Sequence, residues 1–112
     1  MHDLEGMFDG PVVAMSSPID ATAVASLSPA EAAIVSAAVE KRRNEFATGR
    51  KLARAALARL GVKDAEILQD HMRAPIWPPG FSGSISHCST KAFVVVGRRD
   101  EIGSIGIDVE DR

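Results

Sequence analysis

The chain has 112 residues, of which 46% are hydrophobic and 25% charged, and its net charge is −2 at pH 7. This length suits one domain, or half of a larger two-part domain. The near-neutral charge gives no support to a nucleic-acid or membrane partner, and no apolar run approaches the ~20 residues of a membrane helix. Cys88 is the only cysteine, which excludes an internal disulfide. The start of the chain lacks signal-peptide order, so we expect a cytoplasmic protein.

The N-terminal part of the chain predicts a strand followed by a capped helix. Residues 1–10 form a lead-in, and the apolar run at 11–15 favours a short strand. Ser28 is a capping residue, a proline follows at the first helical position, and Glu31 completes a capping box. The alanine-rich helix that begins here is expected to continue to about Val39.

Residues 41–60 predict a second helix, which is amphipathic and is followed by a glycine suited to end it. Its basic residues are clustered. Arg43, Arg50 and Arg54 lie within about 40° of one another around the helix axis, beside the apolar stripe. Arg42 lies one residue before Arg43 and therefore about 100° away from it around the helix axis. A solvated basic face and a phosphate-binding face both explain this pattern. Nucleic-acid binding is disfavoured, because the chain as a whole is not basic.

The C-terminal part predicts a proline-rich loop and several strands. A short strand is expected at 66–69, whereas the three prolines within 73–80 forbid regular structure there. Trp77 in this loop is expected to pack over the core. Further strands are expected at 83–88, at 92–97 and at 102–110, the last as the hairpin partner of the strand before it. A strand, two helices and then several strands indicate the α+β class.

The strand predicted at 102–110 has two carboxylates on one face. Asp108 and Glu110 are two residues apart and therefore stand side by side, roughly 7 Å apart. Carboxylate oxygens suit a Mg²⁺ that also holds phosphates, although a half-buried edge strand explains the pattern as well. His87 follows Ser86 at a strand end, where hydroxyl, imidazole and backbone N–H groups can hold a phosphate. His87 can instead join the two carboxylates in a metal site.

Four sequence motifs occur in order along the chain. They are RRNEFATGR with a following AR at 42–54, WPPG at 77–80, GSISHC at 83–88 and IGIDVE at 105–110. Together they resemble the 4′-phosphopantetheinyl transferases of the surfactin type, especially the subgroup similar to enterobactin synthase component D. The resemblance extends from about residue 40 to the C-terminus.

The resemblance implies an enzyme that uses coenzyme A and Mg²⁺ to place a phosphopantetheine arm on a serine of an acyl or peptidyl carrier protein. Asp108 and Glu110 would bind the metal around the coenzyme A pyrophosphate. His87, with Ser86, would meet the 3′-phosphate. The coenzyme A-binding set that the resemblance implies is Arg42, Arg50, Arg54, Arg73, Ser86, His87 and Asp108.

Members of this family are pseudo-dimers of two similar α+β halves, each with helices packed on a small, mainly antiparallel sheet. The family's Lys-Glu motif, which lies beyond the Asp-x-Glu motif, is absent from this sequence. We therefore expect an N-terminal half-domain without a catalytic residue of its own, which needs a C-terminal half or self-associates through the half-interface. Its expected parts are a lead-in and strand at 1–27, two helices at 28–60, and a proline-rich loop with strands at 61–112.

Two other functions stay open at this point. One is a non-catalytic coenzyme A- or nucleotide-binding module, which would bind coenzyme A without transferring any part of it. The other is a metal-dependent phosphodiesterase built on His87, Asp108 and Glu110, whose activity would be lost in Asp108→Ala. The sequence does not identify the carrier protein, and siderophore synthesis is one pathway that the subgroup suggests.

The missing Lys-Glu motif generates a first prediction. The 112-residue chain, incubated with Mg²⁺, labelled coenzyme A and an apo carrier protein, should transfer no label above the enzyme-free background. A two-half family enzyme serves as the positive control. Measurable incorporation by this chain alone would show that its own residues are sufficient for transfer.

Overall fold

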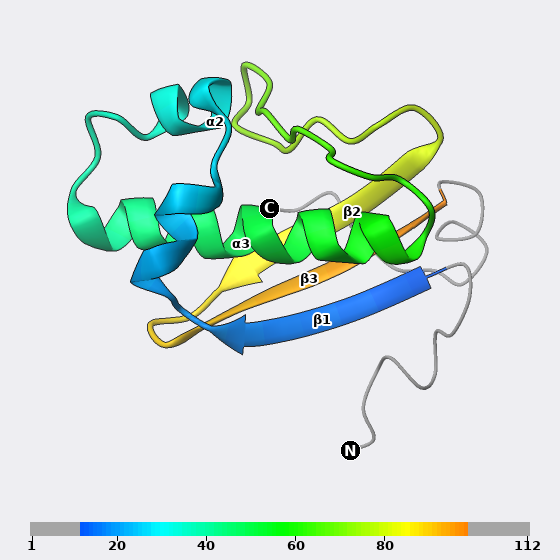
Figure 1. Ribbon diagram of the computed structural model, residues 1–112, viewed down its shortest axis with the longest axis horizontal. Helices are drawn as coiled ribbons and strands as arrows, with labels where there is room; N and C mark the ends of the chain where they lie inside the picture. Colours follow the sequence, from blue (N-terminus) through cyan, green and yellow to red (C-terminus); the bar gives the residue numbers. More distant parts are fainter. Residues whose placement is uncertain (1–11, 99–112) are drawn as a thin grey trace.

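The structure, a computed structural model, describes residues 12–98 as a layer of helices on one face of a three-stranded antiparallel sheet (Figure 1). The α+β class predicted from the sequence is confirmed. In chain order the elements are β1 (Val12–Pro18), the 3-10 helix η1 (Ala21–Ser26), α2 (Pro29–Ile34), α3 (Glu40–Arg59), β2 (Phe81–His87) and β3 (Lys91–Arg98).

The sheet has the order β1-β3-β2, so β3 is the central strand. β2 and β3 form a hairpin, and β1 pairs with the other edge of β3 along its length. Both edges of β3 are therefore occupied. This corrects the expectation that residues 102–110 are the hairpin partner of this strand, because that partner is β2. Residues 102–110 lie outside the described residues.

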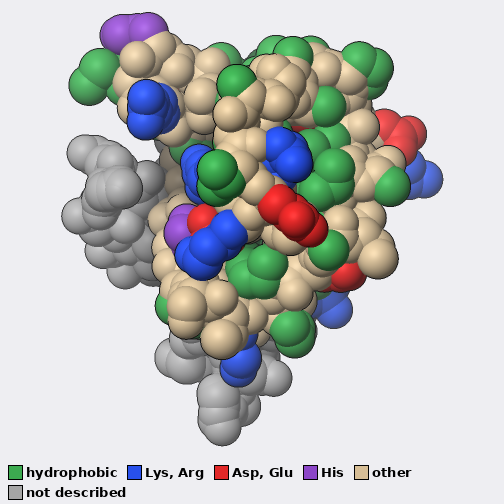
Figure 2. All heavy atoms as spheres, turned by 90° about the vertical axis from the view of Figure 1, so that its left-hand side faces the viewer, with side chains coloured by type: hydrophobic (Ala, Val, Ile, Leu, Met, Phe, Trp, Pro, Cys, Tyr) green, Lys and Arg blue, Asp and Glu red, His purple; other side chains and the backbone are tan. Residues whose placement is uncertain are grey.

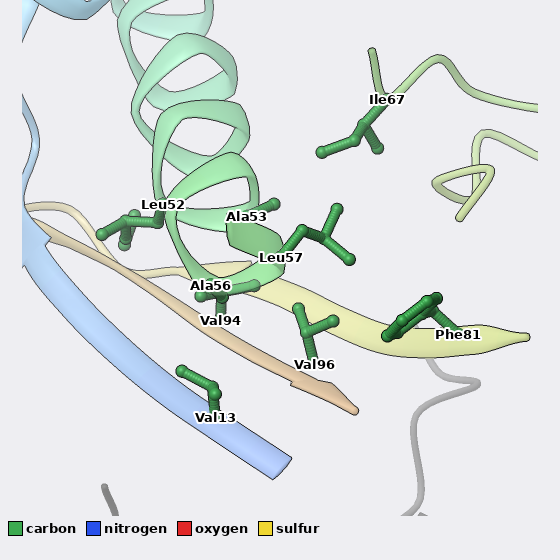
Figure 3. Packing of buried hydrophobic residues seen from close by; sticks show 10 residues of the cluster. Val13, Leu52, Ala53, Ala56, Leu57, Ile67, Phe81, Val94 and Val96 are labelled. Carbon is green, nitrogen blue, oxygen red and sulfur yellow. The ribbon is translucent and has the colours of Figure 1, made fainter. Parts of the chain in front are cut away.

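The core lies between α3 and the sheet (Figure 3). Alternate residues of β3 point toward the helix, and α3 turns its small and apolar side chains onto them. Ala53 and Leu57 are completely buried, as the helical spacing predicted. Each fully buried aliphatic side chain stabilises the fold by about 1.5–3 kcal/mol. The contact is made by Leu52, Ala53, Ala56 and Leu57 of α3 with Val13, Phe81, Val94 and Val96 of the sheet and Ile67 of the following loop.

The first helix is capped as predicted but is shorter than predicted. Ser28 Oγ accepts from the Glu31 backbone N–H at 3.1 Å, and a Glu31 carboxylate oxygen accepts from the Ser28 N–H at 3.0 Å. α2 ends at Ile34 instead of Val39. Hydrogen bonds to the third residue back tighten the chain there. The Ser36 hydroxyl also donates a hydrogen bond to the Ala33 carbonyl, and this bond competes with continuation of the helix.

The long helix α3 ends where the sequence predicted. Gly61 has φ +96°, a conformation that L side chains rarely adopt. The Gly61 N–H donates to the Ala58 carbonyl at 3.1 Å and the Val62 N–H donates to the Leu57 carbonyl at 2.9 Å. This pair of bonds is a Schellman motif. No helix among residues 12–98 is both long enough and apolar enough to cross a membrane.

The loop between α3 and β2 differs from its prediction in one respect. Residues 66–69 form no strand, and only an isolated bridge joins Gln69 to Pro75. Trp77 is half-buried and packs against the core, as expected. It lies directly over Gly83 of β2. A Cβ atom added at Gly83 would lie 2.9 Å from the Trp77 ring and 2.5 Å from the Val95 carbonyl oxygen.

This close approach generates a second prediction. Gly83→Ala should lower the free energy of unfolding by about 1–3 kcal/mol, because the backbone oxygen cannot move aside for the added methyl group. Chemical denaturation measures the loss. Ser84→Ala, one residue along on the opposite face of β2, is the control and should change stability far less. Equal stability of the Gly83→Ala variant and the unmodified chain would contradict the packing described here.

Candidate functional site

Arg50, a predicted phosphate ligand, is almost buried against the loop that follows α3. Its side chain is 5% exposed. The Nε atom donates to the Ile67 carbonyl at 2.8 Å, and Nη2 lies 3.3 Å from the Leu68 carbonyl. Burial lowers the pKa of Arg50 to about 10, although Glu31 opposes the change, so the group stays cationic at neutral pH. Among residues 12–98, these bonds use two of the five N–H groups of the guanidinium and fix its orientation.

Arg54, also predicted to bind coenzyme A, is held within the fold. Its Nη1 atom donates to both carboxylate oxygens of Glu31, at 3.0 and 2.8 Å, and lies 3.1 Å from the Ala65 carbonyl. Nη2 lies 3.1 Å from the Ser26 carbonyl. The guanidinium therefore joins α3 to η1, to α2 and to the loop after α3. These contacts give Arg54 a structural role.

Glu31 is the centre of this network and is completely buried. It accepts from Arg54, from the Ser28 N–H and, at 2.8 Å, from the Ile67 N–H. Burial opposes its ionisation, but these hydrogen bonds and the Arg54 charge together lower its pKa. Side chains of α2 and α3 thus satisfy the backbone of residues 65–68. This explains why the strand predicted at 66–69 does not form.

A second cluster joins the first turns of α3 to the end of β2. Glu45 is 7% exposed, and its carboxylate lies 2.7 Å from Lys41 Nζ and 3.7 Å from Nε2 of His87. The Lys41 hydrogen bond is the main cause of the lowered pKa of Glu45; burial opposes it, and the charges of His87 and Arg42 contribute to it. His87, the predicted 3′-phosphate ligand, therefore lies on the α3 face of the sheet.

Arg42 and Arg50 are linked by one aromatic ring. The guanidinium carbon of Arg42 lies 5.8 Å from the centroid of Phe46, and that of Arg50 lies 4.2 Å from it. Residues 42, 46 and 50 follow one another at four-residue spacing along one face of α3. The ring limits the orientations of both cations. We call Arg42, Glu45, Phe46, Arg50 and His87 the basic site.

Figure 2 faces the end of the molecule where α3 begins and β2 ends. Cationic side chains, a histidine and acidic side chains gather there. Arg42 is close enough to influence the titration of both Glu45 and Arg50, which places the members of the basic site in one electrostatic environment. The structure thus brings together Arg42, Arg50 and His87 from the predicted coenzyme A-binding set.

Two other predicted ligands are placed elsewhere. Neighbouring residues of a strand point to opposite faces, so the Ser86 side chain faces away from the α3 side on which His87 lies. Arg73 is exposed in the loop before β2 and has φ +68°. Asp70 shapes this turn, since its carboxylate accepts from the Met72 and Ala74 N–H groups. The roles of Ser86 and Arg73 stay predictions.

The predicted metal ligands Asp108 and Glu110 lie outside the described residues. Within residues 12–98, no group of three His, Cys, Asp or Glu side chains is arranged to hold a metal ion.

The importance of two acidic residues, Glu31 and Glu45, is not predicted from the sequence. The capping box predicts Glu31 only as part of a helix cap, and Glu45 is not among the predicted site residues. The Lys41–Glu45 pair has the i, i+4 spacing of a helical ion pair, so this contact of Glu45 can be recognised from the sequence. The contacts of Glu31 with Ile67 and of Glu45 with His87 span 36 and 42 positions, and no local pattern encodes them.

The described residues thus form a small α+β domain with a cationic cluster at one end. A family model described as the 4′-phosphopantetheinyl transferase N-terminal domain matches residues 30–97. The chain therefore belongs to the 4′-phosphopantetheinyl transferase family, as its motifs suggested.

Curated relatives agree with this assignment. Over 82 residues, which are 73% of this chain and 36% of the relative, the chain is 50% identical to 4′-phosphopantetheinyl transferase PptT of Mycobacterium tuberculosis. It is 47% identical to 4′-phosphopantetheinyl transferase Svp of Streptomyces mobaraensis, over 78% of this chain and 35% of the relative. With enterobactin synthase component D of Salmonella typhimurium it shares 44% identity over 62% of this chain and 28% of the relative. The chain spans about a third of the length of these relatives.

A solved structure shares the fold. It is a holo-(acyl-carrier-protein) synthase from Bacillus anthracis in complex with CoA, with a TM-score of 0.61 and 19% sequence identity. The match covers 77% of this chain and 92% of that chain. The likeness confirms the predicted fold class.

The Glu31 network generates a third prediction. Glu31→Gln should lower the free energy of unfolding by about 3 kcal/mol, because the Arg54 charge loses its buried partner. The lowered pKa of Glu31 makes its contribution present above the ordinary glutamate value of 4.5 and lost as the pH falls below it. Denaturation at several pH values should therefore show a steeper acid loss for the unmodified chain than for the variant.

Glu40→Gln, at an exposed position at the start of α3, is the matched control. It should leave both the stability and its pH dependence close to those of the unmodified chain. Parallel acid profiles for the Glu31→Gln variant and the unmodified chain would show that the Glu31 carboxylate does not stabilise the fold.

Proposed function

We propose that this chain supplies the coenzyme A-binding side of a Mg²⁺-dependent enzyme that transfers the 4′-phosphopantetheine arm of coenzyme A to a serine of a carrier protein. The observation that carries the proposal is the basic site in a member of this family. Arg42, Arg50 and His87 come from two elements that are distant in sequence, and they meet at one end of the molecule.

The chemistry of the site suits a phosphate-rich ligand. Arg42 is exposed and can move onto a phosphate while its stem stays beside Phe46. Arg50 is held by two carbonyl groups, so it offers a fixed cation whose orientation is already determined before the ligand arrives. His87 adds a smaller donor at the end of β2. We assign Arg54 to the fold and not to the ligand, because Glu31 and two carbonyl groups already bind it.

Phosphoryl transfer needs these charges because an incoming serine oxygen is repelled by anionic phosphates. Coenzyme A carries a pyrophosphate and a 3′-phosphate, and arginine and histidine cations would lower their negative charge and fix their positions. The proposed reaction breaks the pyrophosphate bond, joins phosphopantetheine to the serine oxygen and releases adenosine 3′,5′-bisphosphate. The serine proton goes to a base that we do not assign to the described residues.

The proposal includes a Mg²⁺ ion, for which Asp108 and Glu110 are the proposed ligands. Two carboxylates at i and i+2 are hard oxygen donors of the kind that Mg²⁺ prefers, and they leave its other positions to water and phosphate. When bound, the ion would neutralise the pyrophosphate charge. This part of the proposal rests on the sequence motif and its resemblance to the family.

The partner in this proposal is an acyl or peptidyl carrier protein together with a C-terminal half that completes the active site. One relative is an enterobactin synthase component D, so a siderophore pathway is one setting for the reaction. The cytoplasmic location expected from the sequence stays a prediction.

A fourth prediction concerns the ligand of the basic site. In calorimetric titrations with Mg²⁺ present, the chain should bind coenzyme A more tightly than 3′-dephospho-coenzyme A. Arg42→Leu should weaken coenzyme A binding by about tenfold, because a charge-assisted bond to phosphate contributes roughly 1.5–3 kcal/mol. Asp108→Ala should remove the gain in affinity that Mg²⁺ gives.

Lys63→Leu is the matched control, since Lys63 is an exposed cation beyond the end of α3 and outside the basic site. It should bind coenzyme A as the unmodified chain does. Equal losses in the Arg42 and Lys63 variants would show that binding depends on net charge and not on the basic site. Absence of any coenzyme A binding would contradict the proposed function for this chain.

A further inference from the structure

Glu45 is a buried carboxylate that phosphate binding does not explain. It lies among the cations of the basic site, yet a negative charge repels the phosphates that those cations are proposed to bind. A buried carboxylate is costly unless it is paired. Glu45 must therefore make an interaction that offsets two costs, the burial of its charge and the repulsion between that charge and a phosphate.

Pairing with Lys41 alone does not account for Glu45. The Lys41 side chain is 69% exposed, and an ion pair of this kind within a helix contributes about 0.5 kcal/mol or less. The other partner, His87, comes from β2 and has a side chain that is 38% exposed. The contact between Glu45 and His87 is thus the one that connects two elements of the fold.

The atoms in contact identify what Glu45 does to His87. One carboxylate oxygen faces Lys41, and the other faces Nε2 of the imidazole at 3.7 Å, which is ion-pair range and slightly longer than a hydrogen bond. A carboxylate only accepts, so it favours the ring form that carries hydrogen on Nε2. At this distance the preference is electrostatic, because the carboxylate stabilises an N–H dipole that points toward it.

We propose that Glu45 is a positioning residue that holds the Nε2–H form of His87 and leaves Nδ1 as the ring nitrogen presented to an anion. The proposal rests on the proposed function only for the identity of that anion, a 3′-phosphate. When the anion binds, Nδ1 takes a proton from solvent and donates it in a hydrogen bond to a phosphate oxygen. The only covalent changes are the N–H bond that forms at Nδ1 and the O–H bond that breaks in the solvent molecule giving up the proton, and the carboxylate of Glu45 balances the positive charge of the ring.

The other charges near Glu45 fit this role. Among residues 12–98, the titratable and charged side chains that face it are Lys41 and Arg42 from its own helix and His87 from β2. Lys41 occupies the oxygen that does not face His87, which fixes the rotation of the carboxylate. Arg42 remains beside Phe46 and is available for the ligand. The negative charge of Glu45 is therefore directed to the ring and away from the phosphate.

The test compares two substitutions in the whole chain. Glu45→Met keeps the length of the side chain but removes the acceptor, whereas Glu45→Gln keeps an acceptor but removes the charge. Heteronuclear NMR of the ring nitrogens at mildly alkaline pH reports the tautomer of His87 without any ligand. The His87 signals are assigned with His87→Gln, and Glu40→Met, an exposed substitution on the same helix, is the control.

We expect the unmodified chain, Glu45→Gln and Glu40→Met to show His87 hydrogen on Nε2, and Glu45→Met to show a mixture of the two tautomers. Backbone NMR spectra confirm that each variant is folded. A His87 ring in Glu45→Met that keeps the unmodified chain's Nε2–H form would overturn the proposal. A mixture of the two tautomers in the unmodified chain would also overturn the proposal.

A second arm adds adenosine 3′,5′-bisphosphate as the probe. The Nδ1 signal of the unmodified chain should shift on binding, and the affinity should fall by about tenfold in Glu45→Met and less in Glu45→Gln. Unchanged affinity in Glu45→Met would also count against the positioning role. If the unmodified chain does not bind the probe while the tautomer results hold, the proposed function fails and the positioning of His87 by Glu45 stands.

Discussion

The fold depends on one buried carboxylate. Glu31 completes the cap of α2, pairs with Arg54 of α3 and accepts from the backbone of Ile67, so a single side chain joins two helices and the loop that follows them. A buried charge is costly unless it is paired and hydrogen-bonded, and each carboxylate oxygen of Glu31 accepts two hydrogen bonds. Because Ile67 is held in this way, its side chain can fill the core beneath the loop.

The basic site depends on this arrangement through Arg50. The guanidinium of Arg50 bonds to the carbonyl groups of Ile67 and Leu68, the segment that Glu31 fixes. Arg50 and Arg42 share the ring of Phe46, and Glu45 connects the same helix to His87 on β2. The two carboxylates thus have different roles. Glu31 places the loop and Arg50, whereas Glu45 faces the histidine at the end of the sheet.

The arginines of α3 show why sequence patterns cannot assign roles to charged residues. On a helical wheel Arg43, Arg50 and Arg54 form one basic stripe. In the fold, Arg43 donates to the Ala38 carbonyl, Arg54 is bound to Glu31, and Arg50 is almost buried. Arg42, one step round the helix, is the exposed member. The loop and α2, which cover part of the stripe, decide how each of these cations is held and how much of it is exposed.

The sequence by itself determined what depends on near neighbours. The capping box at Ser28, the end of α3 at Gly61, the apolar face of α3 and the α+β order all follow from periodicity and local hydrogen bonding, and the motifs identified the family. Only the tertiary structure decided the roles of Glu31 and Glu45, the contact of His87 with α3, and the absence of a strand at 66–69. These features depend on contacts between residues far apart in the chain, whose energy depends on burial and mutual geometry rather than on spacing.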